Sequence, residues 1–145
     1  MKTKAVRMYG KNDLRLEEFD LPPIGEDEIL AHIISDSICM SSYKAAIQGA
    51  EHKRVPKDIA HNPIIIGHEF CGEIVEVGSK WKDSYRAGSK FTIQPALNQK
   101  NDPYASPGYS FKYIGGSATY IVIPNVVMEL GCLLPYEGDS FFSGS

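Results

Sequence analysis

The sequence predicts a mainly β fold with one or two short helices, and three observations support that prediction. Apolar and polar residues alternate with a period of two along most of the chain, as expected for strands with one buried face. The 13 glycines and nine prolines among 145 residues predict many turns between short strands. A helical pattern with clear end signals stands out over residues 41–49.

Turn residues divide the chain into the following predicted elements. Residues 3–9 and 13–19 form a hairpin around Gly-Lys-Asn. The later strands are residues 28–38, 64–67, 71–78 and 91–97, with a glycine-interrupted pair of strands over residues 109–124. The helix takes Ser41 or Ser42 as its N-cap and ends at Gly49. No element is predicted after residue 132, and Phe141 and Phe142 are expected to pack on a segment beyond the chain.

Composition and charge limit the class of protein. A chain of 145 residues suits one domain with its own core. The net charge of −3 gives no general reason to expect nucleic acid or an anionic membrane as a partner. No apolar run approaches the ~20 residues that span a bilayer, and the start of the chain lacks the apolar segment of a signal peptide. The three cysteines are an odd number, which argues against a disulfide framework. We therefore expect a soluble cytoplasmic domain that binds neither nucleic acid nor membrane.

Three residues are candidates for binding a metal: Cys39, His68 and Glu69. Each lies at the end of a predicted strand, and strand ends far apart in sequence can converge. Zinc takes thiolate, imidazole and carboxylate ligands, and a catalytic zinc keeps one position open for water or substrate. Taken separately, a cysteine is more often a small core residue, and a His-Glu pair after glycine is more often a turn. The residues alone therefore leave both interpretations open.

Four motifs, in order along the chain, resemble those of one enzyme family. Residues 67–78 (GHEFCGEIVEVG) fit the pattern G-H-E-x-x-G-x-x-x-x-x-G, and Cys39 is followed two residues later by Ser41. Residues 85–91 (YRAGSKF) resemble the family's xxGDxV turn, and residues 115–124 (GGSATYIVIP) resemble its GGFAEYxxxP strand. The chain thus resembles the GroES-like catalytic domain of the zinc-dependent medium-chain alcohol and polyol dehydrogenases. That resemblance implies a GroES-like, partly open β-barrel over residues 1–145.

The resemblance implies a role for each matching residue. Cys39 and His68 match zinc ligands, and Glu69 matches a glutamate that ligates zinc in polyol dehydrogenases and lies close behind it in other members. Ser41 matches the hydroxyl that bonds the substrate alcohol and passes on its proton, so Ser41 and Glu69 are the catalytic candidates. The implied reaction is NAD(P)-dependent oxidation of a secondary alcohol, or reduction of the ketone, through a zinc-bound alkoxide.

Several features depart from the family pattern. Ser42 stands where the family often has aspartate, and Lys44 stands where many members have a relay histidine. No cysteine-rich lobe follows the strand at residues 91–97, which implies one catalytic zinc and no structural zinc. The strand–GxGxxG–helix motif of a dinucleotide-binding domain does not occur in residues 1–145. We therefore expect the N-terminal part of a longer, homo-oligomeric enzyme, inactive by itself because a C-terminal Rossmann domain is missing.

The expected substrate is a small alcohol, polyol or sugar phosphate. The missing cysteine lobe and residues 38–56 resemble the sugar-phosphate members of the family. Lys44, together with Lys53, Arg54 and Lys57, could supply cations to a phosphate, although a solvated face would carry the same charges.

Two other kinds of protein are alternatives. A non-enzymatic GroES-like binding or assembly module, as in the co-chaperonin, would have no use for a thiol, an imidazole, a carboxylate and a hydroxyl together. A zinc-free quinone-reductase-like relative should lack the cysteine and the His-Glu pair, so the sequence argues against it. Metal content discriminates between the zinc enzyme and the non-enzymatic module.

Overall fold

The protein consists of two antiparallel sheets and two short α-helices, described here from a computed structural model of residues 1–137. The smaller sheet has the strand order β2-β1-β4, and the larger has the order β7-β3-β5-β6-β8. The strands are β1 (Lys2–Gly10), β2 (Asp13–Asp20), β3 (Ile29–Asp36), β4 (Ile64–Ile65), β5 (Phe70–Val77), β6 (Lys90–Ile93), β7 (Tyr120–Ile123) and β8 (Leu133–Tyr136). The helices are α1 (Met40–Gln48) and α2 (Asn125–Glu129), with single 3-10 turns η1 (Gly49–Glu51) and η2 (Ser79–Trp81). The predicted mainly β fold with one or two short helices is confirmed.

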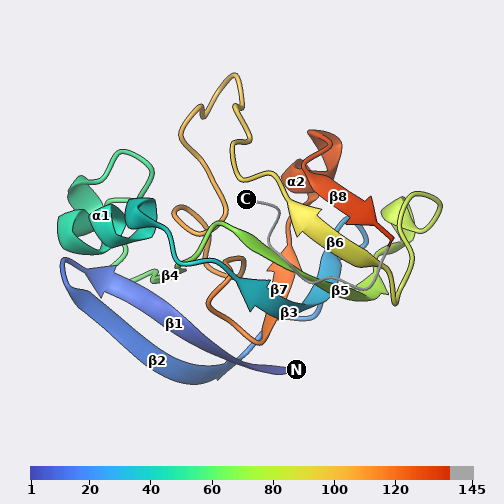
Figure 1. Ribbon diagram of the computed structural model, residues 1–145, viewed down its shortest axis with the longest axis horizontal. Coiled ribbons are helices and arrows are strands. Elements are labelled where there is room, and N and C mark those ends of the chain that lie inside the picture. The colour runs from blue at the N-terminus through green and yellow to red at the C-terminus, as the bar shows by residue number, and fades with distance from the viewer. Residues whose placement is uncertain (138–145) are drawn as a thin grey trace.

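The helix α1 lies at the left end of the molecule in Figure 1, and α2 lies to the right of centre, close to β6 and β8. The β1–β2 hairpin runs along one side, and α1 lies beyond its turn end, whereas α2 and β8 lie at the far end of the larger sheet. Between them, the long connection from β6 to β7 rises above the sheets. No helix within residues 1–137 is long and apolar enough to cross a membrane.

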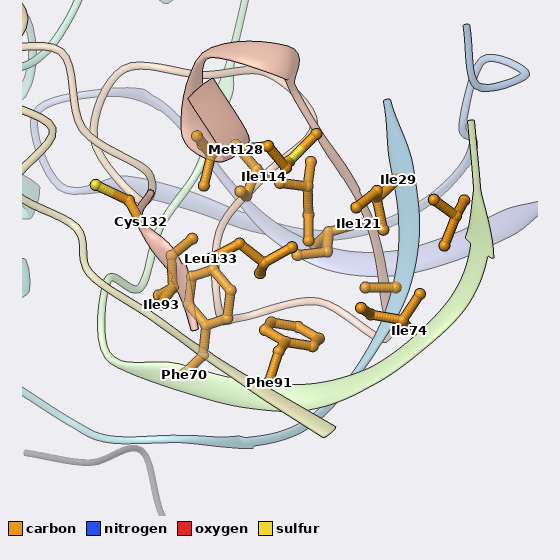
Figure 2. Packing of buried hydrophobic residues seen from close by; sticks show 14 of the residues in the cluster. Ile29, Phe70, Ile74, Phe91, Ile93, Ile114, Ile121, Met128, Cys132 and Leu133 are labelled. Carbon is orange, nitrogen blue, oxygen red and sulfur yellow. The ribbon is translucent and has the colours of Figure 1, made fainter. Parts of the chain in front are cut away.

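The main core lies on the inner face of the larger sheet and under α2 (Figure 2). Phe70 of β5 and Phe91 of β6 are fully buried there, with ring centroids 6.4 Å apart and ring planes at 85°. Edge-to-face aromatic pairs of this kind add to the free energy gained from burial. The other members of the cluster include Ile29, Ile74, Ile93, Ile114, Ile121, Met128, Cys132 and Leu133.

A second, smaller core holds α1 against the rest of the protein. Ala45 is the buried residue of α1, and it packs in a cluster with Met8 of β1 and Tyr109 of the β6–β7 connection. The same cluster takes up Val55 and Ile59 from the connection that follows α1. This connection has few regular elements, but its apolar side chains fix its position beside α1.

Some predicted elements differ from the structure at their ends. The prediction of a serine N-cap is wrong: Cys39 occupies the N-cap position with φ −123° and ψ 141°, and no side chain of the described residues caps the helix. The stop at Gly49 is confirmed, because this residue has φ 55°, a conformation that favours glycine. The strand predicted for residues 91–97 ends at Ile93.

The second half of the chain departs further from the prediction. The prediction of a pair of strands over residues 109–124 is wrong. Turns and bends occupy the first part of this range, and only β7 forms a strand there. The prediction that no element follows residue 132 is also wrong, because β8 forms there and pairs with β6. Pro135 lies in β8, which is an edge strand, where a missing backbone donor is tolerated. Phe141 and Phe142 lie outside the described residues.

Candidate metal centre

The structure brings the three predicted metal-binding residues together. Cys39 follows β3 at the start of α1, and His68 and Glu69 form the turn between β4 and β5. One ligand atom from each residue (a cysteine sulfur, an imidazole nitrogen and a carboxylate oxygen) lies within 4.8 Å of the other two. Within residues 1–137 these residues form a group whose chemistry suits a metal ion.

The pairing of β3 with β5 explains why residues so distant in sequence meet. Asp36 at the end of β3 is the register partner of Phe70 at the start of β5. The Ser37 N–H donates a hydrogen bond of 2.8 Å to the Glu69 carbonyl, which extends this pairing one step beyond the strands. Cys39, which follows β3, therefore lies close to the His-Glu turn, which precedes β5.

Glycines allow the close approach that this pairing requires. Gly67 has φ 98°, so the turn before His68 takes a conformation that other residues rarely adopt. A Cβ on Gly72 would lie 1.9 Å from the His32 carbonyl oxygen on β3, so β5 could not lie so close to β3 with any side chain there. These are two of the glycines in the motif that the sequence resembled.

His68 is buried, and each of its two ring nitrogens has polar neighbours. Its Nδ1 lies 3.2 Å from Ser42 Oγ and 3.1 Å from the Tyr109 hydroxyl. Its Nε2 lies 3.9 Å from Glu69 Oε1, on the other side of the ring. When Nδ1 carries the proton and donates it to one of the two hydroxyls, Nε2 presents its lone pair toward Glu69.

The charge state of His68 also suits a ligand. Burial lowers the pKa of this imidazole, the nearby Glu69 carboxylate opposes that effect, and the Arg54 guanidinium adds to the lowering. The net effect favours the neutral ring at pH 7, and the neutral imidazole is the form that binds a metal.

The three side chains fit a zinc ion by chemistry and by spacing. Thiolate, imidazole and carboxylate are the ligand types that zinc uses, and three protein ligands leave the fourth position open. Ligands at about 2.0–2.3 Å from one tetrahedral zinc lie roughly 3.3–3.8 Å apart. The observed limit of 4.8 Å therefore needs a contraction of about 1 Å, which side-chain rotation supplies.

A cavity of about 230 Å³ opens beside Cys39. Its lining includes Ser42 and Tyr43 of α1, and also Asp36, Gly67 and Ser117, together with apolar side chains. The cavity is large enough for a small polyhydroxylated molecule to approach Cys39.

Asp36 is an unusual carboxylate in this cavity. Ser117 Oγ donates a hydrogen bond of 3.2 Å to Asp36 Oδ2, but Oδ1 is buried and has no hydrogen-bond partner among residues 1–137. Burial raises the pKa of Asp36 to about 6, with the Ser117 hydrogen bond opposing and the Glu69 charge adding to the rise. A carboxyl group so placed titrates near neutral pH.

The two other predicted site residues lie on α1 but away from this cavity. Ser41 is exposed, and its hydroxyl hydrogen-bonds to Tyr109. Burial raises the pKa of Tyr109 and this bond counteracts the rise. Lys44 is exposed and, at 3.6 residues per turn, lies on the opposite side of the helix from Ser42 and Ala46, which line the cavity. Lys44 therefore does not join the group formed by Cys39, His68 and Glu69.

Sequence analysis missed two residues that contact His68. Ser42 had a signal, because it stands where the family often has aspartate, another oxygen acceptor. Tyr109 had none: it lies 41 positions beyond His68, in a segment without regular structure. Its ring packs 5.0 Å from the His68 ring, centroid to centroid.

Known proteins are similar to this chain in sequence and in fold. The chain is 57% identical over 143 residues to L-sorbose 1-phosphate reductase of Klebsiella pneumoniae, covering 99% of this chain and 35% of that protein. It is 46% identical over 143 residues to mannitol-1-phosphate 5-dehydrogenase of Aliivibrio fischeri, covering 99% and 33%. The chain thus spans about a third of the length of these curated relatives.

A solved structure supports the fold independently. A cobalt- and zinc-bound thermostable alcohol dehydrogenase from Pyrobaculum aerophilum superposes with a TM-score of 0.74, covering 96% of this chain and 43% of that one. At 17% identity this likeness concerns the fold alone.

The family assignment rests on the match over most of the chain. Residues 25–131 match the alcohol dehydrogenase GroES-like domain, which confirms both the family resemblance and the GroES-like fold predicted from the sequence. The chain belongs to the alcohol dehydrogenase GroES-like domain family.

Proposed function

We propose that this chain is the zinc- and substrate-binding domain of an NAD(P)-dependent dehydrogenase that interconverts a secondary alcohol of a polyol or sugar phosphate and its ketone. The observation that carries the proposal is the convergence of Cys39, His68 and Glu69 within 4.8 Å beside a cavity. The curated relatives, a sugar-phosphate reductase and a sugar-phosphate dehydrogenase, support the reaction type and the substrate class.

In this proposal Cys39, His68 and Glu69 hold one zinc ion. Zinc supplies Lewis-acid chemistry, polarising the oxygen of a bound alcohol or ketone. His68 keeps its orientation through the hydroxyls of Ser42 and Tyr109, which bond its Nδ1. Hydrogen-bonded partners of this kind orient a metal-binding imidazole and strengthen its binding.

Ser41 serves the proton transfer. Its Oγ accepts the hydroxyl proton of the alcohol, and the adjacent Tyr109 hydroxyl gives that proton a second group to reach. The pairing of Ser41 with Tyr109 supplies a relay where the sequence has Lys44 in place of the family's histidine.

The hydride acceptor in the proposal is NAD(P). Since residues 1–145 contain no strand–GxGxxG–helix motif, we place the dinucleotide on a domain outside them. The whole enzyme would then close the cavity between two domains and assemble from several copies.

The test is NAD(P)-linked turnover by the whole protein. We expect reduction of L-sorbose 1-phosphate with NADH or NADPH, loss of that activity in a chelator, and its return with zinc. Cys39→Ser should be inactive under all three conditions. Turnover that survives the chelator, or that Cys39→Ser retains, would refute the zinc mechanism. A protein with neither zinc nor turnover would favour a non-enzymatic binding module.

A further inference from the structure

We propose that Arg54 recognises the phosphoryl group of a phosphorylated sugar substrate, an inference that rests on the function proposed above. The guanidinium lies in the connection after α1, beside the long connection between β6 and β7. It is the cation that the structure links most directly to the candidate metal centre.

No carboxylate within residues 1–137 neutralises Arg54. The ion pairs that the described residues form, with a nitrogen–oxygen distance up to 4.0 Å, involve Arg7, Lys11, Arg15, His68 and Lys80 but not Arg54. Its Nη1 instead donates to two neutral acceptors, the Tyr104 carbonyl at 3.3 Å and Ser106 Oγ at 3.0 Å. A half-buried guanidinium without an acidic partner is suited to an anionic ligand.

The backbone of Arg54 is also fixed on both sides. Its N–H donates to His52 Nδ1 at 3.1 Å, and its carbonyl accepts a hydrogen bond of 2.6 Å from Ser110 Oγ. The backbone from which the side chain extends is therefore held by hydrogen bonds on both sides. Since both guanidinium hydrogen bonds within the described residues start at Nη1, the donors on Nε and Nη2 remain for a forked contact with phosphate oxygens.

Arg54 lines a cavity of about 270 Å³. Lys53 and Ser110 line it with Arg54, and the Lys53 ammonium lies 5.2 Å from the centroid of the Tyr104 ring. One carboxylate, Asp102, also lines the cavity, so the two cations still leave a net positive lining. Two cations and a hydroxyl are the groups that commonly bind a phosphate monoester.

Short contacts connect this cavity to the metal centre. His52, which accepts the Arg54 N–H, stacks on Tyr109 with ring centroids 5.4 Å apart and planes at 10°. Tyr109 in turn bonds His68. The Arg54 charge also contributes to the lowered pKa values of His52 and His68, so its field reaches the metal centre. The proposal places the reacting carbon of the sugar at the metal centre and its phosphate at Arg54.

Direct binding measurements test the assignment. The whole protein would be titrated by calorimetry with L-sorbose 1-phosphate, with unphosphorylated L-sorbose, and with adenosine 2′-phosphate as a stand-in for the phosphate of NADP. The variants are Arg54→Gln, which removes the charge, Ser106→Ala, which removes one neutral tether, and Lys44→Gln, which removes an exposed cation on α1.

We expect Arg54→Gln to weaken binding of L-sorbose 1-phosphate by about 10- to 100-fold, as for loss of a charge-assisted hydrogen bond. In the same variant, the affinity for L-sorbose and for adenosine 2′-phosphate should change by less than about twofold. In Ser106→Ala and Lys44→Gln, the affinity for all three ligands should change by less than about twofold.

Three outcomes would overturn the assignment. They are unchanged sugar-phosphate binding by Arg54→Gln, an equal loss for L-sorbose, and a loss confined to adenosine 2′-phosphate. A loss in Lys44→Gln alone would transfer the role to Lys44. Because these titrations need neither hydride transfer nor turnover, a failure of the proposed reaction would show separately, as absent NAD(P)-linked activity with phosphate discrimination intact.

Discussion

His68 shows how single residues set the properties of the candidate site. Its two neighbours on the Nδ1 side, Ser42 and Tyr109, fix the ring, and burial keeps the imidazole neutral. A motif search finds His68 and its adjacent Glu69 but has no means to find Tyr109, which comes from a separate segment. The candidate ligands could therefore be named from the sequence, whereas the hydrogen bonds that orient His68 depend on the tertiary fold.

Asp36 supports a prediction about pH and stability. Its pKa is about 6 in the folded chain and near 3.8 when exposed, so folding favours the protonated form. The stability that this group contributes is then fully present below about pH 4 and is lost as the pH rises through 6. After allowance for partial solvent screening, the loss is about 1–2 kcal/mol.

We expect Asp36→Asn to remove this loss. Urea unfolding of the metal-free chain in a chelator should show the Asn variant more stable than wild type at pH 7.5 and nearly equal to it at pH 4. Asp83→Asn, at an exposed position, serves as the control. A stability difference that stays constant across this pH range would refute the buried titration.

Among the elements, the β3–β5 pair has the largest effect on the site, because it carries Cys39 at one end and His-Glu at the other. This pairing depends on Gly72, whose missing side chain leaves room for the His32 carbonyl. The sequence indicated both strands by their alternation, but it could not show that they are neighbours. Strand pairing is a long-range property that the alternation of one segment does not encode.

Gly72→Ala should therefore destabilise the chain strongly. The added methyl group would meet the His32 oxygen at 1.9 Å, forcing the two strands apart at a cost of about 3 kcal/mol or more. Gly10→Ala is the matched control, because nothing lies within 4 Å of a Cβ at Gly10 and the change should cost less than about 0.5 kcal/mol. Urea midpoints measure both, and equal effects would contradict the packing argument.

The predicted elements were most accurate where local signals were strong. The alternation of the first hairpin located β1 and β2 to within one residue at each end. The β6–β7 connection was misjudged because its apolar residues, such as Tyr109 and Ile114, fill two cores without forming strands. β8 lies in a segment for which no element was predicted; it contains Pro135, which an edge position tolerates.

At the scale of the whole molecule, two cores support one candidate site. The larger core fixes β5, and the smaller core fixes α1 and Tyr109, so the candidate ligands from the two regions are held at the boundary between them. The Arg54 cavity lies beside the smaller core, because the connections after α1 and before β7 both line it and both contribute residues to that core, Val55 and Ile59 from the first and Tyr109 from the second. The GroES-like fold thus gathers residues from four separate segments at one place.

The account depends most on one claim, that Cys39, His68 and Glu69 bind a single zinc ion. Elemental analysis of the purified chain, after incubation with zinc and dialysis, tests it directly. We predict about one zinc per chain in the wild type and in Cys132→Ala, and almost none in Cys39→Ser or His68→Ala. A wild-type chain without zinc, or variants of Cys39 and His68 that keep it, would contradict the account.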